Sequence, residues 1–208
     1  TDVITIRGIS INGFCNGIRG INILQAKTVN VEDCVIFRFA GPGIQVTETS
    51  DLNLNLKNTV IRDNTGDGIN ATTSHASLRI RGTLDHVHLV GNANGLHSRS
   101  GASFTARNSV FSNNTQNGVF CDAAGTVFAG VSVWDSQISG NGANGVRAGN
   151  AGNLGGSGVQ IGQNQIDNNV GNGVLVSTNG VVNTFTNNSI LANGTDGCPG
   201  CTNAAPGN

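Results

Sequence analysis

The sequence predicts an all-β solenoid, in which one chain winds into short coils of strands that stack on each other. Three observations predict it. The chain is rich in Gly and Asn but still rich in apolar residues. A short Asn- and Gly-containing motif returns about every 26 residues, which is the period of a repeat architecture. Around each copy of the motif, apolar and polar side chains alternate with the period of a β-strand.

The composition is unusual for a globular protein but does not indicate disorder. Among 208 residues there are 31 Gly and 30 Asn, and charged residues make up only 11%, against about 25% in an average domain. Hydrophobic residues still make up 37%, which is enough apolar surface to form a core. The chain is therefore long and apolar enough for one folded domain.

The repeated motif is Asn, two spacer residues, Asn or Asp, Gly, and then an apolar residue, most often β-branched. It reads "NTGDGI" at 64–69, "NTQNGV" at 114–119, "NGANGV" at 141–146 and "NVGNGV" at 169–174. Its Gly defines a series with intervals of 23 to 28 residues. The series is Gly17, Gly43, Gly68, Gly95, Gly118, Gly145, Gly173 and Gly197.

Counting from this Gly reveals columns of equivalent residues. Inward positions lie one and three residues after it, as in Val119 and Cys121, and seven and twelve residues before it, as in Phe111 and, in the last repeat, Phe185. Asn, Asp or Gln occupies the position ten residues before the Gly. The Gly95 repeat fits if its turn is one residue short, with Leu89 in the core and His86 in the Asn place. Each repeat then contains about three short strands.

A single repeat is too small to fold alone, because it must order about 26 residues at a cost of about 1–2 kcal/mol each. Stacked copies pair strand with strand at about 4.8 Å. The Asn and Asp columns can then bond along the stack, and the motif is a corner that tolerates positive φ. The expected structural ladder residues are Asn58, Asn108, Asn187, Asn64, Asn114, Asn141 and Asn169.

With these corners and the opening strand-like "VITIRGISING", the sequence resembles the right-handed parallel β-helix repeat proteins of the pectate-lyase-like superfamily, over essentially the whole chain. The resemblance implies a single-stranded right-handed parallel β-helix of about seven to eight coils with three short parallel sheets. We assign 1–197 to this β-helix and 198–208 to a C-terminal tail or cap that contains "CPGC".

The resemblance places any active site on the outward face of the strand after the Asn-Gly corner. There the candidate acid and base are His97 and Asp122, and these two are the catalytic candidates. Two Arg and one aromatic residue lie on the same three predicted strands and, with one Asn of the preceding strand, are candidates for ligand binding. These ligand-binding candidates are Arg99, Phe120, Arg147 and Asn70.

A simpler interpretation of the same residues is a solvated strand face, in which Asp122 pairs with Arg99 and Arg147 on neighbouring strands. The polygalacturonase-like elements "NTD", "DD", "GHG" and "RIK" are absent, as is the "DPHD" of an alginate epimerase. We therefore expect a non-catalytic extracellular or surface scaffold or carbohydrate-binding module. The alternatives are a lyase, hydrolase or epimerase that acts on acidic polysaccharides, and an assembly or fibre segment that stacks end to end.

No cofactor and no metal are expected. Asp63 and Asp67 at the Gly68 corner are the candidates for calcium, but turn aspartates usually bond the backbone. His86 and His88 are a candidate pair for a transition metal, without a third ligand in view. Cys198 and Cys201 are expected to form a disulfide, and Cys121 is expected to point inward as a small apolar residue.

The expected partner is a polysaccharide or a cell-surface glycan. A net charge of −1 argues against binding to nucleic acid,. The sequence contains no apolar run of 18 residues, so membrane insertion is not expected. The strand edges at the ends of the solenoid predict either end-to-end self-association or a larger parent chain. A terminal disulfide fits an oxidising compartment, so the expected location is secreted, periplasmic or on the cell surface.

Overall fold

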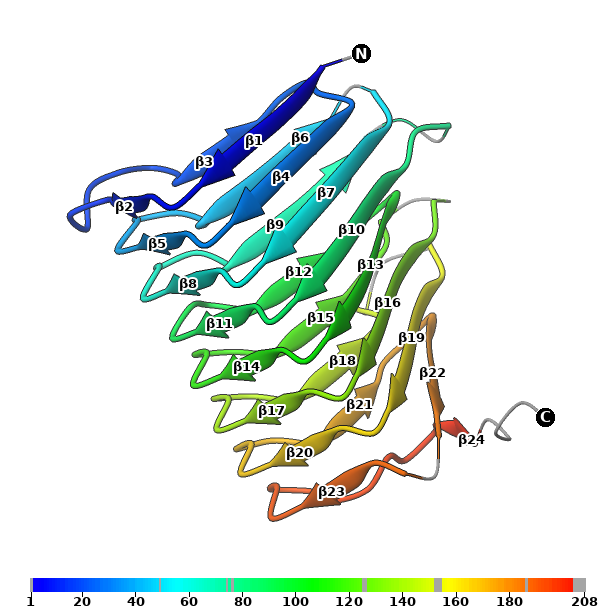
Figure 1. Cartoon of the computed structure of the whole chain (residues 1–208). Coiled ribbons are helices and arrows are strands. Elements are labelled where there is room, and N and C mark those ends of the chain that lie inside the picture. Colours follow the sequence, from blue (N-terminus) through cyan, green and yellow to red (C-terminus); the bar gives the residue numbers. More distant parts are fainter. Residues whose placement is uncertain are drawn as a thin grey trace.

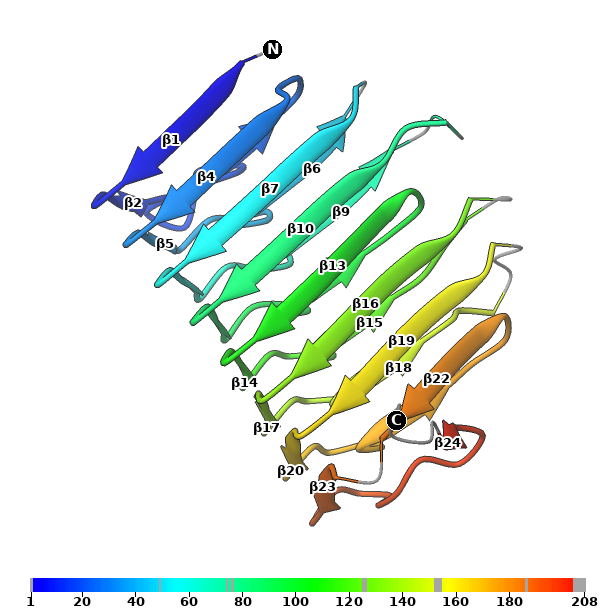
Figure 2. The same ribbon diagram turned by 45° about the vertical axis from the view of Figure 1, so that its right-hand side comes forward.

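The computed structural model shows a parallel β-solenoid, and it describes residues 2–48, 50–73, 75, 77–124, 127–151, 155–185 and 187–203. Successive coils stack from one end of the molecule to the other, and the two termini lie near opposite ends (Figure 1). Seen from the side in Figure 2, the long strands lie next to each other in chain order, each one coil after the last. Within the described ranges there are strands and turns but no helix.

Each coil contributes one strand to each of three parallel sheets, which we call the first, second and third sheets. The nine strands of the first sheet are β1 (Val3–Arg7), β4 (Thr28–Glu32), β7 (Leu52–Lys57), β10 (Ile80–Asp85), β13 (Ala102–Arg107), β16 (Ala129–Trp134), β19 (Ser157–Gly162), β22 (Gly180–Thr184) and β24 (Thr202–Asn203). The eight strands of the second sheet are β2 (Ser10–Asn12), β5 (Val35–Phe37), β8 (Val60–Arg62), β11 (His88–Val90), β14 (Val110–Ser112), β17 (Gln137–Ser139), β20 (Gln165–Asp167) and β23 (Ser189–Leu191). The seven strands of the third sheet are β3 (Ile21–Ile23), β6 (Ile44–Glu48), β9 (Ile69–Thr73), β12 (Leu96–Ser98), β15 (Val119–Cys121), β18 (Val146–Ala148) and β21 (Val174–Val176).

The core consists of straight files of apolar side chains, as the repeat predicts. In the third sheet, Ile69, Leu96, Val119, Val146 and Val174 are register partners along the stack, and each is fully buried. Equivalent files in the other two sheets face the same interior. Burying one such side chain contributes about 1.5–3 kcal/mol, so successive coils stabilise each other through the continuous core.

The corner between the first and second sheets explains the Asn, Asp or Gln column. Its residues adopt left-handed backbone conformations, which Asn and Asp accept more readily than other residues with a side chain. His86 has φ of 54° and occupies the Asn place, so the short turn of the Gly95 repeat is confirmed. The other members are Asp33, Asn58, Asn108, Asp135 and Gln163, with φ of 48–57°.

Two buried ladders of asparagine side chains run along the corner between the second and third sheets. The first ladder is Asn64, Asn92, Asn114, Asn141, Asn169 and Asn193, and each Nδ2 donates to the Oδ1 of the next coil at 2.7–3.4 Å. The second ladder is Asn94, Asn117, Asn144 and Asn172, and each Nδ2 donates at 2.8–3.0 Å to the preceding coil. The expected ladder of Asn64, Asn114, Asn141 and Asn169 is confirmed.

The other expected ladder residues form separate contacts and no continuous ladder. Asn58 donates to Asp33 and Asn108 donates to Asp85, both at 3.1 Å, on the exposed side of the corner. Asn187 accepts a bond from the backbone N–H of Gln163 at 3.0 Å. Between Asn58 and Asn108, His86 bonds its chain neighbour Asp85.

The predicted register is wrong at both ends of the solenoid. Strand β3 pairs Ile21 with Ile44, so Gly20 occupies the first corner, not Gly17. In the last coil Thr184, not Phe185, pairs with the core residue Ile161. The Phe185 ring packs outside, 4.8 Å from that of Trp134. Both errors arise because the end coils have loops of different length, which a fixed count from Gly cannot detect.

The C-terminal tail stays attached to the last coils. Cys198 and Cys201 form a disulfide and pack against the core. Strand β24 then pairs with Asn183 and Thr184 of β22. The predicted tail segment 198–208 therefore contributes a short strand to the first sheet as far as residue 203, and residues 204–208 lie outside the described residues.

Candidate functional site

The outward face of the third sheet aligns the predicted site residues. Asn70, His97, Phe120 and Arg147 are successive register partners on β9, β12, β15 and β18. Because the sheet is parallel and in register, equivalent positions on adjacent coils lie about 4.8 Å apart. The prediction that these residues share one face is confirmed.

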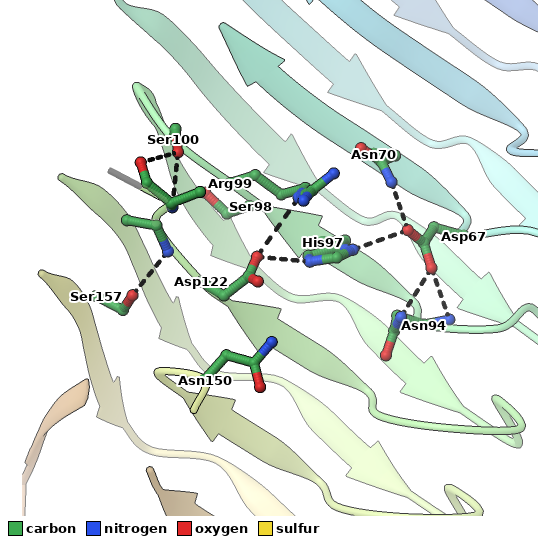
Figure 3. A network of polar contacts seen from close by, with 12 residues as sticks. Asp67, Asn70, Asn94, His97, Ser98, Arg99, Ser100, Asp122, Asn150 and Ser157 are labelled. Carbon is green, nitrogen blue, oxygen red and sulfur yellow. Dashed lines mark hydrogen bonds and ion pairs between the residues drawn. The ribbon is translucent and has the colours of Figure 1, made fainter. Parts of the chain in front are cut away.

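His97 bridges two aspartates from different coils, which is the central feature of this face (Figure 3). Its Nδ1 lies 2.9 Å from Oδ2 of Asp67, and its Nε2 lies 2.8 Å from Oδ1 of Asp122. The exposed fractions of the three side chains are 12% for His97, 10% for Asp67 and 5% for Asp122. We call Asp67, His97 and Asp122 the Asp–His–Asp cluster.

Asp67 links this cluster to the second asparagine ladder. Its Oδ1 accepts bonds from the backbone N–H and the Nδ2 of Asn94, at 3.1 and 2.8 Å. Its Oδ2 accepts from Asn70 at 2.7 Å and lies against His97. A carboxylate accepts about four hydrogen bonds, so Asp67 is fully satisfied where the ladder ends.

Burial and hydrogen bonding act in opposite directions on these groups. Burial by itself lowers the pKa of His97, but the bonds to Asp122 and Asp67 outweigh it, so the pKa of the imidazole lies above its ordinary value. Burial raises the pKa of Asp67, but bonds and charge from His97, together with Asn94, outweigh it and lower that pKa. Both shifts favour an imidazolium held by ionised carboxylate.

Phe120, one of the candidates for ligand binding, does not present a free face. Its ring stacks on the imidazole of His97 at 4.5 Å with an interplanar angle of 18°. The guanidinium carbon of Arg147, from the strand on the other side, lies 4.8 Å from the ring centroid. Phe120 is only 7% exposed, because neighbours on both adjacent strands cover it.

Of the two arginines predicted to pair with Asp122, Arg99 does and Arg147 does not. Nε of Arg99 lies 3.6 Å from Oδ1 of Asp122, and the Arg99 side chain is 41% exposed. Arg147 instead donates to Asn150 at 2.9 Å, and its buried Nε has no hydrogen-bond partner among the residues that the structure describes. Asp122 is buried, so the expected solvated strand face does not form. With His97 protonated, three cations stand beside two carboxylates on this surface.

The predicted alternatives for metal binding have other contacts. Asp63 pairs with Arg62, and Asp67 belongs to the Asp–His–Asp cluster. His86 bonds its neighbour Asp85, whereas His88 is exposed on β11. Across the described part of the chain, no three His, Cys, Asp or Glu side chains are grouped to hold a metal ion. Cys121 is buried as expected, and burial raises the pKa of its thiol to about 12.

Comparison with known proteins agrees with this architecture. Residues 2–103 match the family model described as "Right handed beta helix region". The chain has the right-handed parallel β-helix fold. This β-helix protein is also similar to the solved A-module of mannuronan C-5 epimerase AlgE4 from Azotobacter vinelandii, with 20% identity and a TM-score of 0.65. That alignment covers 92% of this chain and 55% of the A-module.

A second solved structure with this fold is that of pectate lyase Pel9A, with 16% identity and a TM-score of 0.53. It covers 79% of the β-helix protein and 46% of the lyase. The chain thus spans about half the length of each structure. No curated protein matches the sequence. Among the described residues, no helix has the length and apolar character needed to cross a membrane.

Sequence reasoning found His97 and Asp122 but missed Asp67 as their partner. From the sequence alone Asp67 is a candidate for calcium, because it lies in a corner and not on the strand. A signal was present: Asp67 stands where Asn117, Asn144 and Asn172 stand in the other copies of the motif. An acidic residue in a column of asparagines, one coil before a histidine on the next strand, indicates a charged pair.

Proposed function

We propose that this β-helix protein is a non-catalytic module that binds acidic glycans through the outward face of its third sheet. One observation carries the proposal: both nitrogens of His97 are occupied by buried carboxylates. A general base must accept a proton from its substrate, and a general acid must give one up within hydrogen-bond reach. The Asp–His–Asp cluster instead acts as a fixed, hydrogen-bonded charged group that orients the neighbouring arginines.

The groups that can meet a ligand are cations and amides. Arg99 is partly exposed, and Arg147 is half-buried. A guanidinium forms bidentate bonds with carboxylates, which uronic acid residues supply. Asn70, half-buried next to Asp67, adds an amide on the adjoining coil. A disulfide between Cys198 and Cys201 fits a role outside the reducing cytoplasm.

The test is binding to an array of acidic and neutral oligosaccharides, followed by calorimetry on the best acidic ligand. Arg99→Ala and Arg147→Ala should each weaken binding about tenfold, which corresponds to about 1.4 kcal/mol. Arg107→Ala, on the outward face of the first sheet, is the matched control. Equal binding by wild type, Arg99→Ala and Arg147→Ala would show that this face is not the binding surface.

A second candidate function, action on acidic polysaccharides, is favoured by the perturbed pKa values of His97 and Asp67 on an outward face. Such clusters are enriched at catalytic sites. The two similar structures bear the names of an epimerase and a lyase. Incubation with polymannuronate and polygalacturonate, monitored by ultraviolet absorption of unsaturated products and by NMR of the sugar protons, would detect either reaction. Turnover that is lost in His97→Gln would replace the binding proposal with this one.

A further inference from the structure

The core is open at the first coil and covered at the last. Ile4 and Val182 belong to the same inward file of the first sheet, which runs coil by coil from β1 to β22. Ile4 is 44% exposed, whereas Val182 is fully buried. A hollow of about 330 Å³, lined mainly by apolar side chains, lies beside Ile4. The difference means that a segment after β22 covers Val182.

Cys201 is the residue that covers Val182. Strand β24 pairs Thr202 with Asn183, so the residue before Thr202 falls next to the residue before Asn183, which is Val182. Cys201 is therefore one further member of the inward file, and it packs against the core. Figure 1 shows β24 beside β22 at the C-terminal end of the stack.

The other half of the disulfide lies over the end of the third sheet. A Cβ added to Gly200 would lie 3.6 Å from the Cβ of Val176, the last residue of β21. The chain therefore passes over β21 before it joins the first sheet as β24. Cys198 also packs against the core. The bond between Cys198 and Cys201 thus supplies the last apolar layer over two of the three sheets, and we call residues 198–203 the latch.

The disulfide of the latch is within reach of a reductant. Both cysteines are half-buried, and Pro199 and Gly200 between them are exposed. A dithiol reductant would give up two electrons and two protons and become a disulfide itself. The bond between the two sulfur atoms would break, and Cys198 and Cys201 would each carry a thiol. Disulfides that solvent reaches are the ones that respond to redox conditions.

The order of the latch depends on its disulfide, because the remaining contacts are short. Strand β24 has two residues and pairs with β22. The N–H of Cys201 donates to the carbonyl of Cys198 at 3.1 Å, which is a bond within the latch itself. Gly200 has a φ of 85°, and glycine loses more conformational freedom on ordering than any other residue. The disulfide reduces this entropic cost by restricting the open chain, and reduction restores the cost.

We infer that the disulfide between Cys198 and Cys201 makes the latch redox-sensitive. In the oxidised protein the latch is closed and covers Val182 and Val176. A dithiol reductant opens it, frees β24 from β22 and leaves this end of the core as open as the first coil. The inference goes beyond the proposed glycan binding and does not depend on it, because the latch shares no residue with the outward face of the third sheet.

The test uses the full chain, oxidised and after treatment with dithiothreitol, with the state of each cysteine read by alkylation and mass spectrometry. Hydrogen exchange of the backbone amides is then measured segment by segment. We expect the amides of β22 to exchange at least about tenfold faster in the reduced protein, because local opening becomes easier there. The amides of β12 and β13, in the middle of the stack, should not change. Reoxidation should restore slow exchange in β22.

Two variants identify the cysteines responsible. The double variant Cys198→Ser with Cys201→Ser should exchange fast in β22 with or without dithiothreitol. Cys15→Ser removes an exposed free thiol and should behave like wild type. The inference is wrong if β22 exchanges equally in oxidised and reduced protein, or if dithiothreitol leaves the disulfide intact in the folded chain. It is also wrong if β12 and β13 accelerate as much as β22, because the whole chain would then be unfolding.

Discussion

The two asparagine ladders use the same side chain in opposite directions, and each ends on an aspartate. In the first ladder every Asn donates toward the C-terminal end, and Asn193 donates its backbone N–H and Nδ2 to Oδ1 of Asp196 at 2.7 and 3.0 Å. In the second ladder every Asn donates toward the N-terminal end, and Asn94 donates to Oδ1 of Asp67 in the same way. An aspartate suits the last place because it accepts hydrogen bonds and has no donor to satisfy.

The two terminal aspartates differ in their surroundings. Asp196 lies exposed in the last coil, where water solvates the rest of its carboxylate, and bonds from Asn193 lower its pKa. Asp67 lies buried in the middle of the described solenoid, where its second oxygen needs protein partners. It obtains them from Asn70 and His97, and His97 in turn requires Asp122.

The difference explains where the candidate site lies. A neutral ladder repeats itself from coil to coil and creates no special surface. A ladder that ends inside the stack leaves a buried negative charge, and burying such a charge is costly unless it is paired. The Asp–His–Asp cluster and the adjacent Arg99 are therefore a consequence of the place where the second ladder stops.

The largest expected effect comes from removing the cation that the buried end of the ladder requires. His97→Phe keeps a ring against Phe120 but leaves Asp67 and Asp122 without a cation between them. We expect a loss of about 3 kcal/mol in the free energy of unfolding, near the lower end for a broken buried ion pair. Urea denaturation at pH 6 measures it, with the exposed His88→Asn as control. A loss equal to that of the control would mean that the cluster is solvated.

Breaking the neutral ladder should lower the free energy of unfolding somewhat less. Asn141 donates to the carbonyl of Phe111 and to Asn169, and it accepts from Asn114. Asn141→Leu leaves these buried groups unpaired, so we expect about 2 kcal/mol of destabilisation, within the range for buried polar groups that lose a partner. The exposed Gln137→Ala on β17 should stay within about 0.5 kcal/mol. Denaturation of both variants at several pH values should give parallel curves, because the ladder carries no charge.

Replacing the aspartate at each ladder end by asparagine should show how much more the buried end contributes to stability than the exposed one. Asp67→Asn keeps an oxygen for Asn94 but turns an amide N–H₂ toward Asn70 and His97, so we expect a loss of about 1 kcal/mol, since one buried donor is left unpaired. Asp196→Asn makes the same chemical change where water is available and should have a smaller effect. Thermal melting of the two variants at pH 6 gives the comparison, and a larger effect at Asp196 would contradict it.

The pH dependence of stability should be the smallest of these effects, and the buried end should contribute to it on both the alkaline and the acid side. The raised pKa of His97 contributes stability that is complete below about pH 6.5 and is lost as the pH rises through the pKa of the folded state. The lowered pKa of Asp67 contributes stability above about pH 4 that is lost as the pH falls through its folded value. Wild type should therefore be most stable between these limits, and His97→Phe should lose the alkaline decline.

Much of this was predictable from the sequence, because stacking makes equivalent residues neighbours. Counting from Gly118 or Gly145 places Val119 against Val146, and Phe120 against Arg147, without any structure. The same counting fails at Gly17 and Phe185, where the loops of the end coils change length. It also missed Asp67, because Asp67 lies in a corner and not on a strand, although an aspartate in a column of asparagines was a signal.

The protonation state of His97 tests the account most directly. In ¹⁵N-labelled protein at pH 6.5, we predict an imidazolium with two ring N–H protons, both protected from exchange and both hydrogen-bonded to carboxylates. We further predict that its pKa lies above the ordinary histidine value and falls toward it in Asp67→Asn. A neutral imidazole with one N–H and one free nitrogen at that pH would contradict the charged Asp–His–Asp cluster and would leave His97 available as a general base.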